Sequence, residues 1–272
     1  MLSVNDYFSG CGGLSQGFKE AGFKIQVAVD NEESYLRTFA HNFKSSETKN
    51  LDLGKDNVEQ NIPGSDIIIA GPPCQGFSLT GPRNIDDPRN KLYLSVFKTL
   101  RLNKPKAFLV ENVRGLKTMW GGMVFKEIIK KFESAGYTVT ESLLNSAEHG
   151  VPQIRHRVFI VGIQKELNKK FEFPKPEFNK DNFISCEEAI GNLPSLENGE
   201  LKNSNYAEKP STNFQKYVMD SNKLFNHEAT LHKQFVKDTI ALVPEGGNYK
   251  DLPKGVGDSR KFNEAWTRYH SK

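Results

Sequence analysis

Cysteine is scarce in this sequence, and its three cysteines are far apart. Cys11, Cys74 and Cys186 form no CxxC pair among the 272 residues, so neither a disulfide framework nor a zinc site is indicated. No apolar run approaches the roughly 18 residues of a membrane-spanning helix, and the N-terminus lacks the basic and then apolar pattern of a secretory signal. We therefore expect a soluble intracellular protein that binds no metal and no membrane.

A strong charge of one sign is also lacking. Lys and Arg number 37 and Asp and Glu number 33, which gives a net charge of +4 and a pI near 8.8. This mild excess is compatible with a polyanionic partner but is too small to demonstrate one. The length allows one large domain or a domain with an appendage, and the sequence contains neither an internal repeat nor a low-complexity block.

The first 164 residues alternate between predicted strands and predicted helices. This alternation is typical of an α/β fold with a mostly parallel, doubly wound sheet. After Gln164 it stops, and we expect a main domain at residues 1–170 and a less regular region at 171–272. The expected strands cover 3–8, 25–29, 66–70, 107–110, 137–143 and 158–163, with a short one before Asp52, and the expected helices cover 14–21, 34–43, 92–102, 123–134, 187–190 and 231–242.

Cys74 comes just after a strand that is predicted to be buried. The segment 71–78 reads GPPCQGFS and follows the apolar run 67–70, and the carboxyl ends of parallel strands are where ligands and chemistry collect. The two prolines before Cys74 stiffen the turn and Gly76 lets backbone approach, so the thiol would be held in a fixed place. These features suit a nucleophile, although a lone cysteine is more often a small buried side chain.

A glycine-rich turn and an acidic residue follow the first two expected strands. Residues 10–13 read GCGG and would lead into a helix, an arrangement that lets a cofactor lie against bare backbone and that also serves ordinary packing. Asp30 comes about 20 residues later, where nucleotide-binding α/β folds hold ribose hydroxyls. Capping of the next helix explains Asp30 equally well.

Further polar residues are expected at the same edge of the sheet. Glu111 ends the fifth strand, although strand-end carboxylates are more often caps than catalysts. Gln153, Arg155 and Arg157 would share one face of an extended segment, which suits a phosphate, a polar base edge or a solvated edge strand. Residues 79–90 lack apolar periodicity and would form a long loop, either a lid or a disordered excursion.

Four of these segments, in this order and spacing, resemble the successive motifs of the DNA (cytosine-5)-methyltransferases. They are FSGCGG at 8–13, GPPCQGFS at 71–78, ENV at 111–113 and QIRHR at 153–157. The similarity extends from Leu2 to about Gln164, with a looser match over 226–253. It implies a Rossmann-like methyltransferase fold, an irregular target-recognition region, double-stranded DNA as the partner and a bacterial cytosolic setting, commonly a restriction-modification system.

The resemblance also implies a site for S-adenosyl-L-methionine and its product S-adenosyl-L-homocysteine. Phe8 would lie against the adenine, Asp30 would hold the ribose and Asp52 would lie on the adenine side. Asp30 is shorter than the Glu that is common at this position in the family. The expected cofactor-binding residues are Phe8, Gly10, Gly12, Gly13, Leu14, Asp30, Asn31, Asp52, Leu53, Pro72 and Leu92.

The catalytic residues that the resemblance implies have types that the chemistry requires. A thiolate from Cys74 would add to C6 of cytosine and make the ring an enamine that takes a methyl group at C5. Glu111, kept protonated by burial, would relieve negative charge near N3. Arg155 and Arg157 would hold the flipped base and its phosphate, and the expected substrate-binding residues are Gln75, Ser78, Arg89, Asn112 and Gln153.

The sequence departs from the family pattern toward Lys272. The Arg-containing segment and the final Gly-Asn motif that usually follow target recognition are not found. We expect a truncated protein, one polypeptide of a split enzyme or a divergent member; in the first two cases a second polypeptide would cover apolar surface beside Phe8 and the first strand. A tRNA-methylating relative, a cofactor-binding subunit without activity and a nicotinamide-dependent dehydrogenase remain alternatives.

Overall fold

The computed structural model describes residues 1–73, 92–201, 205–219, 221 and 223–256, and the chain divides into two compact units. The first unit comprises Met1–Asn145 and Arg155–Lys175, and the second comprises Ser146–Ile154 and Pro176–Lys272. The chain therefore leaves the first unit after residue 145, returns at residue 155 and leaves it again after residue 175.

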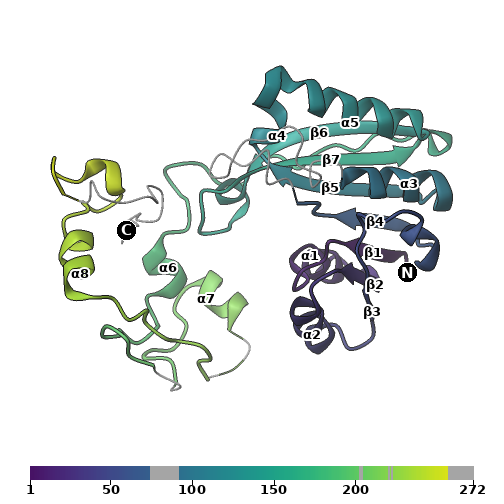
Figure 1. Cartoon of the computed structure of the whole chain (residues 1–272). Helices are drawn as coiled ribbons and strands as arrows, with labels where there is room; N and C mark the ends of the chain where they lie inside the picture. The colour runs from purple at the N-terminus through teal and green to yellow at the C-terminus, as the bar shows by residue number, and fades with distance from the viewer. Residues whose placement is uncertain (74–91, 202–204, 220, 222, 257–272) are drawn as a thin grey trace. The chain divides into compact units, whose positions relative to one another are not determined.

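A seven-stranded sheet forms the centre of the first unit (Figure 1). Its order is β3-β2-β1-β4-β5-β7-β6, and among the described strands β7 runs opposite to the other six. This confirms the expected α/β class with a mostly parallel sheet. The strands are β1 (Ser3–Tyr7), β2 (Lys24–Asp30), β3 (Glu47–Asn50), β4 (Ile67–Ala70), β5 (Ala107–Val113), β6 (Tyr137–Asn145) and β7 (His156–Gln164).

Helices cover both faces of this sheet, so its central strands are apolar on both sides. In β4, Ile68 and Ala70 join the larger core cluster on one face, whereas Ile67 and Ile69 join the smaller cluster on the other. Figure 1 shows α1 and α2 beside β1–β3, and α3 to α5 beside the other half of the sheet. The helices are α1 (Gly13–Glu20), α2 (Glu33–Asn42), α3 (Tyr93–Asn103), α4 (Gly115–Thr118) and α5 (Met123–Ser134), with 3-10 turns η1 (Val58–Asn61), η4 (Met119–Gly122) and η6 (Lys165–Leu167).

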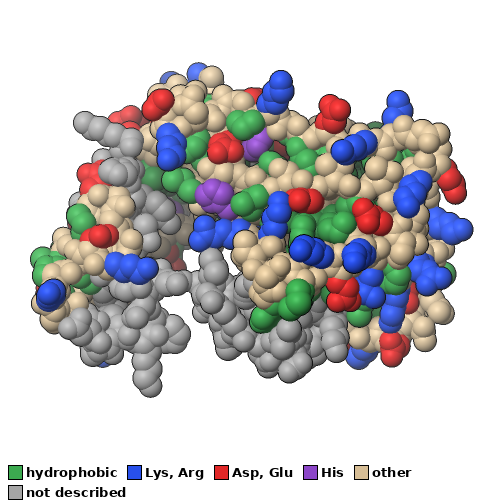
Figure 2. Space-filling view, turned by 90° about the horizontal axis from the view of Figure 1, so that it is seen from above, with side chains coloured by type: hydrophobic (Ala, Val, Ile, Leu, Met, Phe, Trp, Pro, Cys, Tyr) green, Lys and Arg blue, Asp and Glu red, His purple; other side chains and the backbone are tan. Residues whose placement is uncertain are grey.

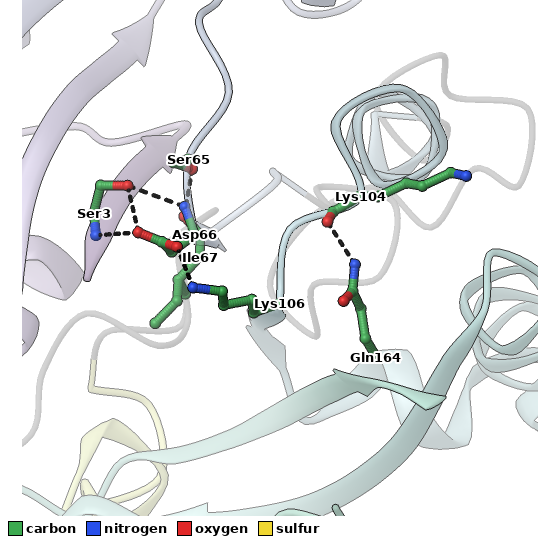
Figure 3. A network of polar contacts seen from close by, with 7 residues as sticks. All are labelled: Ser3, Ser65, Asp66, Ile67, Lys104, Lys106 and Gln164. Atoms are coloured by element: carbon green, nitrogen blue, oxygen red, sulfur yellow. Dashed lines mark hydrogen bonds and ion pairs between the residues drawn. The ribbon is translucent and has the colours of Figure 1, made fainter. Parts of the chain in front are cut away.

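One carboxylate ties three strands together at their N-terminal ends (Figure 3). Asp66 accepts hydrogen bonds from the Ser3 backbone N–H at 2.9 Å and the Ser3 hydroxyl at 3.0 Å, and its other oxygen lies 2.8 Å from Lys106 Nζ. These bonds, that from Lys106 foremost, hold the pKa of Asp66 at about 2. Asp66 therefore acts as a charged structural anchor, at the end of the sheet opposite to the residues that the sequence predicts to be functional.

The second unit has little regular structure. Its helices are α6 (Cys186–Ile190), α7 (Asn213–Val218) and α8 (Gln234–Ala241), with 3-10 turns η5 (Ser146–His149) and η7 (Tyr249–Asp251). Capping boxes start α6 at Ser185 and α7 at Thr212. The expected helices at 187–190 and 231–242 correspond to α6 and to the shorter α8, whereas α7 is not among those expected.

The surface mixes charges of both signs. On the face shown in Figure 2, Lys and Arg side chains are interspersed with Asp and Glu. No helix in the described part of the chain is long and apolar enough to cross a bilayer. The described residues also contain no group of three or more His, Cys, Asp or Glu side chains arranged to hold a metal ion.

Candidate active site

The order of the strands reverses between β1 and β4, and the crevice at the carboxyl ends of such a pair is where open α/β sheets bind ligands. After β1 the chain enters a tight turn, with Phe8, Gly10 and Gly12 at positive φ angles of 57°, 52° and 98°. Helix α1 then begins at Gly13 without a side-chain cap. The Ser15 N–H of the first turn bonds to the Asp6 carboxyl, and the N–H groups of Gly13 and Leu14 precede it at this edge, where a helix N-terminus can meet a ligand.

Asp30 links the end of β2 to this turn. Its Oδ2 accepts a hydrogen bond from the Gly10 backbone N–H at 2.9 Å, and its Oδ1 accepts one from Glu32 N–H at 3.0 Å. Glu32, rather than Asp30, is the residue that caps α2. The helix-cap explanation for Asp30 is therefore wrong, and the carboxylate helps to shape the glycine turn.

The glycines of the turn have different surroundings. A Cβ at Gly12 would lie 2.5 Å from the Phe43 ring and 3.0 Å from the Phe39 ring, whereas a Cβ at Gly10 or Gly13 would meet no atom within 4 Å. Gly12 is therefore required by packing inside the protein. Gly10 and Gly13 present bare backbone to open space, as a ligand-binding turn requires.

The third strand brings another group of predicted cofactor residues together. A Cβ at Gly54 would lie 3.1 Å from Asp52 Oδ1 and 3.2 Å from Leu92 Cδ2, so Asp52 and Leu92 flank this glycine. The Leu53 side chain is buried in the larger core cluster, which leaves only its backbone for a ligand. Asn31 is exposed next to Asp30, and Leu14 packs partly against the smaller cluster.

A second carboxyl, Asp6, lies buried beneath the turn in β1. Its Oδ2 accepts a 2.7 Å hydrogen bond from the Ser15 hydroxyl of α1, and its side chain is 1% exposed. Burial raises the pKa of Asp6 to about 7, against the opposing effect of the Ser15 hydrogen bonds. Asp6 is not among the residues that the sequence predicts to be functional, because β1 also holds the polar Ser3 and Asn5 and no local pattern marks the carboxyl.

The chain leaves β4 through Gly71 and two prolines that lead to Cys74. Pro72 is buried, and Cys74, Gln75, Ser78, Arg89 and the expected loop at 79–90 lie outside the described residues. Glu111 of β5 reaches toward this exit, because its Oε2 lies 3.9 Å from the position of a Cβ at Gly71. A carboxyl group is thus held beside the backbone three residues before the predicted nucleophile.

Glu111 is paired with Arg157. Arg157 Nε lies 2.8 Å from Glu111 Oε1, and both side chains are about one-fifth exposed, at 22% and 23%. Burial raises the pKa of the Glu111 carboxyl above its ordinary value, although the charges of Arg157 and Arg155 and the bond from Arg157 oppose that rise. The raised pKa agrees with the direction expected from the sequence.

Asn112 follows Glu111 in β5, so its side chain lies on the other face of the sheet. It contacts the segment that leaves β4 at Pro72. Its side chain is 4% exposed, its Nδ2 donates a 3.1 Å hydrogen bond to the Pro72 carbonyl, and its Oδ1 accepts one from Val113 N–H at 2.8 Å. The Asn112 amide therefore holds the loop that leads to Cys74. The sequence predicted a substrate contact for Asn112, and these backbone bonds give it a positioning role.

The predicted extended face of Gln153, Arg155 and Arg157 is only partly formed. Strand β7 begins at His156, so Gln153 and Arg155 precede it. Both side chains are exposed, and Gln153 belongs to the second unit, whereas Arg155 and Arg157 belong to the first. Of the three, the structure brings Arg157 to Glu111.

Comparisons with known proteins agree with these motifs. The family model for the C-5 cytosine-specific DNA methylases matches residues 2–268. The type II methyltransferase M1.HphI of Haemophilus parahaemolyticus is 34% identical over 99% of this chain and 68% of its own length, and M.DdeI of Desulfomicrobium norvegicum is 34% identical over 92% and 63%.

A solved structure is similar over the whole chain. A DNA modification methyltransferase encoded within a prophage of E. coli superposes with a TM-score of 0.75 and 25% identity, covering 100% of this chain and 84% of that one. The chain spans between about half and two thirds of the length of its curated relatives, from 52% to 68% among the first three. The chain belongs to the C-5 cytosine-specific DNA methylase family.

Proposed function

We propose that this chain transfers a methyl group from S-adenosyl-L-methionine to C5 of cytosine in double-stranded DNA, in a bacterial cytosol. The observation that carries the proposal is the position of Glu111. Its carboxyl is largely buried, has a raised pKa and lies beside Gly71, which precedes Cys74 by three residues. A carboxyl group that can donate a proton, next to the loop that carries the thiol, is what nucleophilic addition to a pyrimidine needs.

The residues around the glycine turn fit the cofactor. Gly10 and Gly13 leave open space where a side chain would stand, and α1 begins without a side-chain cap. The Asp30 carboxylate accepts one described bond at each oxygen, and each oxygen has a second lone pair for a ribose hydroxyl. Phe8 would lie against the adenine, with Asp52 and Leu92 beside it. When bound, the cofactor supplies an electrophilic methyl group.

The protein's own groups would perform the remaining steps. Cys74 would add through its sulfur to C6 of a base rotated out of the duplex, and protonated Glu111 would donate to N3 as negative charge develops on the ring. Arg157 would orient the carboxyl through its Nε bond. Once the ring carries the methyl group at C5, loss of the C5 proton to water, elimination of the Cys74 thiolate and return of the N3 proton to Glu111 would release the methylated base.

Two surfaces could receive a second polypeptide. Beside Phe8 and the first strand, where the sequence predicts such a surface, β1 is buried along Val4–Tyr7 and Phe8 is partly exposed. Partly exposed apolar side chains also lie on one face of β5 and β7, where Leu109, Phe159 and Ile163 follow the strand register. We propose that a second polypeptide covers apolar surface of this kind, and that residues 171–272 contribute to target recognition.

Two assays test the proposed activity. Methyl transfer from labelled S-adenosyl-L-methionine into DNA and into RNA is measured for the wild type and Cys74→Ser, with and without a relative's C-terminal fragment. A 5-fluorocytosine DNA oligonucleotide is then used to trap the covalent adduct. We expect label in DNA and an adduct that Cys74→Ser abolishes; label confined to RNA would favour the RNA-methylating alternative, and cofactor binding without any adduct would identify a non-catalytic subunit.

A further inference from the structure

A cavity of about 430 Å³ lies at the base of the first unit. It is formed where α1 ends, where β2 begins and where α2 connects to β3. These are the N-terminal ends of the strands, whereas Asp30 and the glycine turn lie at the other end of β2. The lining residues are Met1, Lys19, Phe23, Lys24, Ile25, Asn42, Phe43, Lys44, Ser45 and Ser46.

The charge around this cavity is of one sign. Lys19, Lys24 and Lys44 contribute to its lining, and none of the lining residues is Asp or Glu. All three lysines are exposed. Basic residues are favoured at the C-terminal ends of helices, which explains Lys19 in α1 and Lys44 after α2. Lys24 begins β2, so this explanation does not apply to it. Three cations with no carboxylate among the lining residues favour an anionic ligand.

The walls between these lysines are apolar and aromatic. Phe23, Ile25 and Phe43 are among the lining residues; Phe23 is partly exposed, and Ile25 and Phe43 are buried. The Lys19 ammonium lies 5.2 Å from the centroid of the Phe43 ring. A volume of this size falls in the range that holds small organic ligands.

We propose that this cavity binds a small aromatic phosphate, whose dianionic group meets the three lysines and whose ring packs against Phe23 and Phe43. Inorganic phosphate would leave the apolar wall in water, and an uncharged aromatic molecule would leave the lysines uncompensated. Both parts of the ligand are therefore needed for binding.

Phe43 connects this cavity to the glycine turn. Its ring stacks on Phe39 with centroids 4.4 Å apart, and both rings bound the space that a Cβ at Gly12 would occupy. A ligand that displaces Phe43 therefore also changes the support behind Gly12. Since Gly12 lies between Gly10 and Gly13, occupancy of the cavity is expected to alter the turn; an effect on cofactor affinity rests on the function proposed above.

Binding is tested with 1-naphthyl phosphate, using 1-naphthol and inorganic phosphate as matched probes, on the full chain saturated with S-adenosyl-L-homocysteine. We expect saturable binding of 1-naphthyl phosphate at least tenfold tighter than either partial probe. The double variant Lys24→Gln and Lys44→Gln should weaken it at least tenfold, whereas Lys126→Gln with Lys130→Gln, on the exposed side of α5, should not. Equal loss in both double variants, or no saturable binding, would refute the site.

Amide NMR spectra provide a readout that is independent of methyl transfer. Addition of 1-naphthyl phosphate should shift the backbone amide signals of Phe43 and Gly12, and these shifts should disappear in the Lys24→Gln and Lys44→Gln variant. If the Lys24→Gln and Lys44→Gln variant keeps these shifts, the ligand binds elsewhere and the proposal is wrong. If the probe binds but the chain transfers no methyl group, the cavity stands and the proposed function fails.

Discussion

Arg157 Nε lies 2.8 Å from Glu111 Oε1, which joins β7 to β5, with which it pairs antiparallel. In the strand register Glu111 is opposite Phe159 and Arg157 is opposite Val113, so the two charged residues meet diagonally across the ladder. Burial and this cation act on the same carboxyl in opposite directions. The ionisation of Glu111 is therefore set by the balance between them.

Replacement of Arg157 should shift that balance. In Arg157→Ala the carboxyl loses both the nearby charge and the hydrogen bond, so the pKa of Glu111 should rise further above its ordinary value. NMR of a ¹³C-labelled Glu111 carboxyl across a pH series measures this change. Arg155→Ala removes a nearby charge but keeps the bond from Arg157 Nε, so it should raise the pKa of Glu111 by less. An unchanged pKa in Arg157→Ala would contradict the pairing.

Asn112→Asp should slow catalysis without weakening cofactor binding. An aspartate side chain cannot donate to the Pro72 carbonyl, and its charge would face that oxygen, so the loop to Cys74 should move. Since small misplacements of reacting groups are costly, we expect adduct formation to fall about 100-fold. S-adenosyl-L-homocysteine affinity, measured by calorimetry, should stay within about twofold. Asn168→Asp, on an exposed turn, is the control, and equal rates in the two variants would exclude a positioning role.

The two turn glycines should respond differently to alanine. Gly12→Ala places a Cβ 2.5 Å from Phe43 at a φ of 98°, so it should lower the free energy of unfolding by more than the roughly 1–2 kcal/mol of a left-handed alanine alone. Gly10→Ala has the strain without the clash and should mainly reduce S-adenosyl-L-homocysteine affinity. Urea unfolding and calorimetry on both variants separate the effects; a reversed pattern would show that the turn is misassigned.

Asp6 should make stability depend on pH. Because its pKa is raised to about 7, the native state keeps the proton to higher pH than the unfolded chain. The free energy of unfolding should therefore fall by roughly 4 kcal/mol as the pH rises from about 4 to about 7, and then level off. Asp6→Asn still accepts from Ser15 and should remove this slope. Urea titrations at several pH values check it, and parallel profiles for the two proteins would rule it out.

The sequence was sufficient to predict the strands and helices whose apolar pattern is a local signal. Ile67–Ala70 and Met123–Ser134 match the expected segments closely, since β-branched runs and a 3.6-residue spacing act within each element. β5 extends to Val113, beyond the apolar run that ends at Val110, because pairing with β7 continues to Arg157. Glu111 is consequently inside a strand rather than after it.

The contacts of the site depended on information that no single segment carries. The Glu111–Arg157 pair follows from the register of β5 against β7, and the packing behind Gly12 follows from the ring of Phe39 in α2 and that of Phe43 just after it. Helix α7 has six residues, too few for a clear apolar period, and only the capping pair of Thr212 and Gln215 marked its start. Long-range pairing and short irregular helices therefore account for much of what the motifs could not predict.

The excursion of residues 146–154 out of the first unit constrains how this enzyme can be recombined with its relatives. Because Asn145 ends β6 and Arg155 precedes β7, the excursion is bounded by two strands that pair along their whole length. A chimaera that exchanges the second unit must therefore use three junctions, after residues 145, 154 and 175. A protein truncated after residue 175 would keep residues 146–154, nine residues of the second unit, between its last two strands.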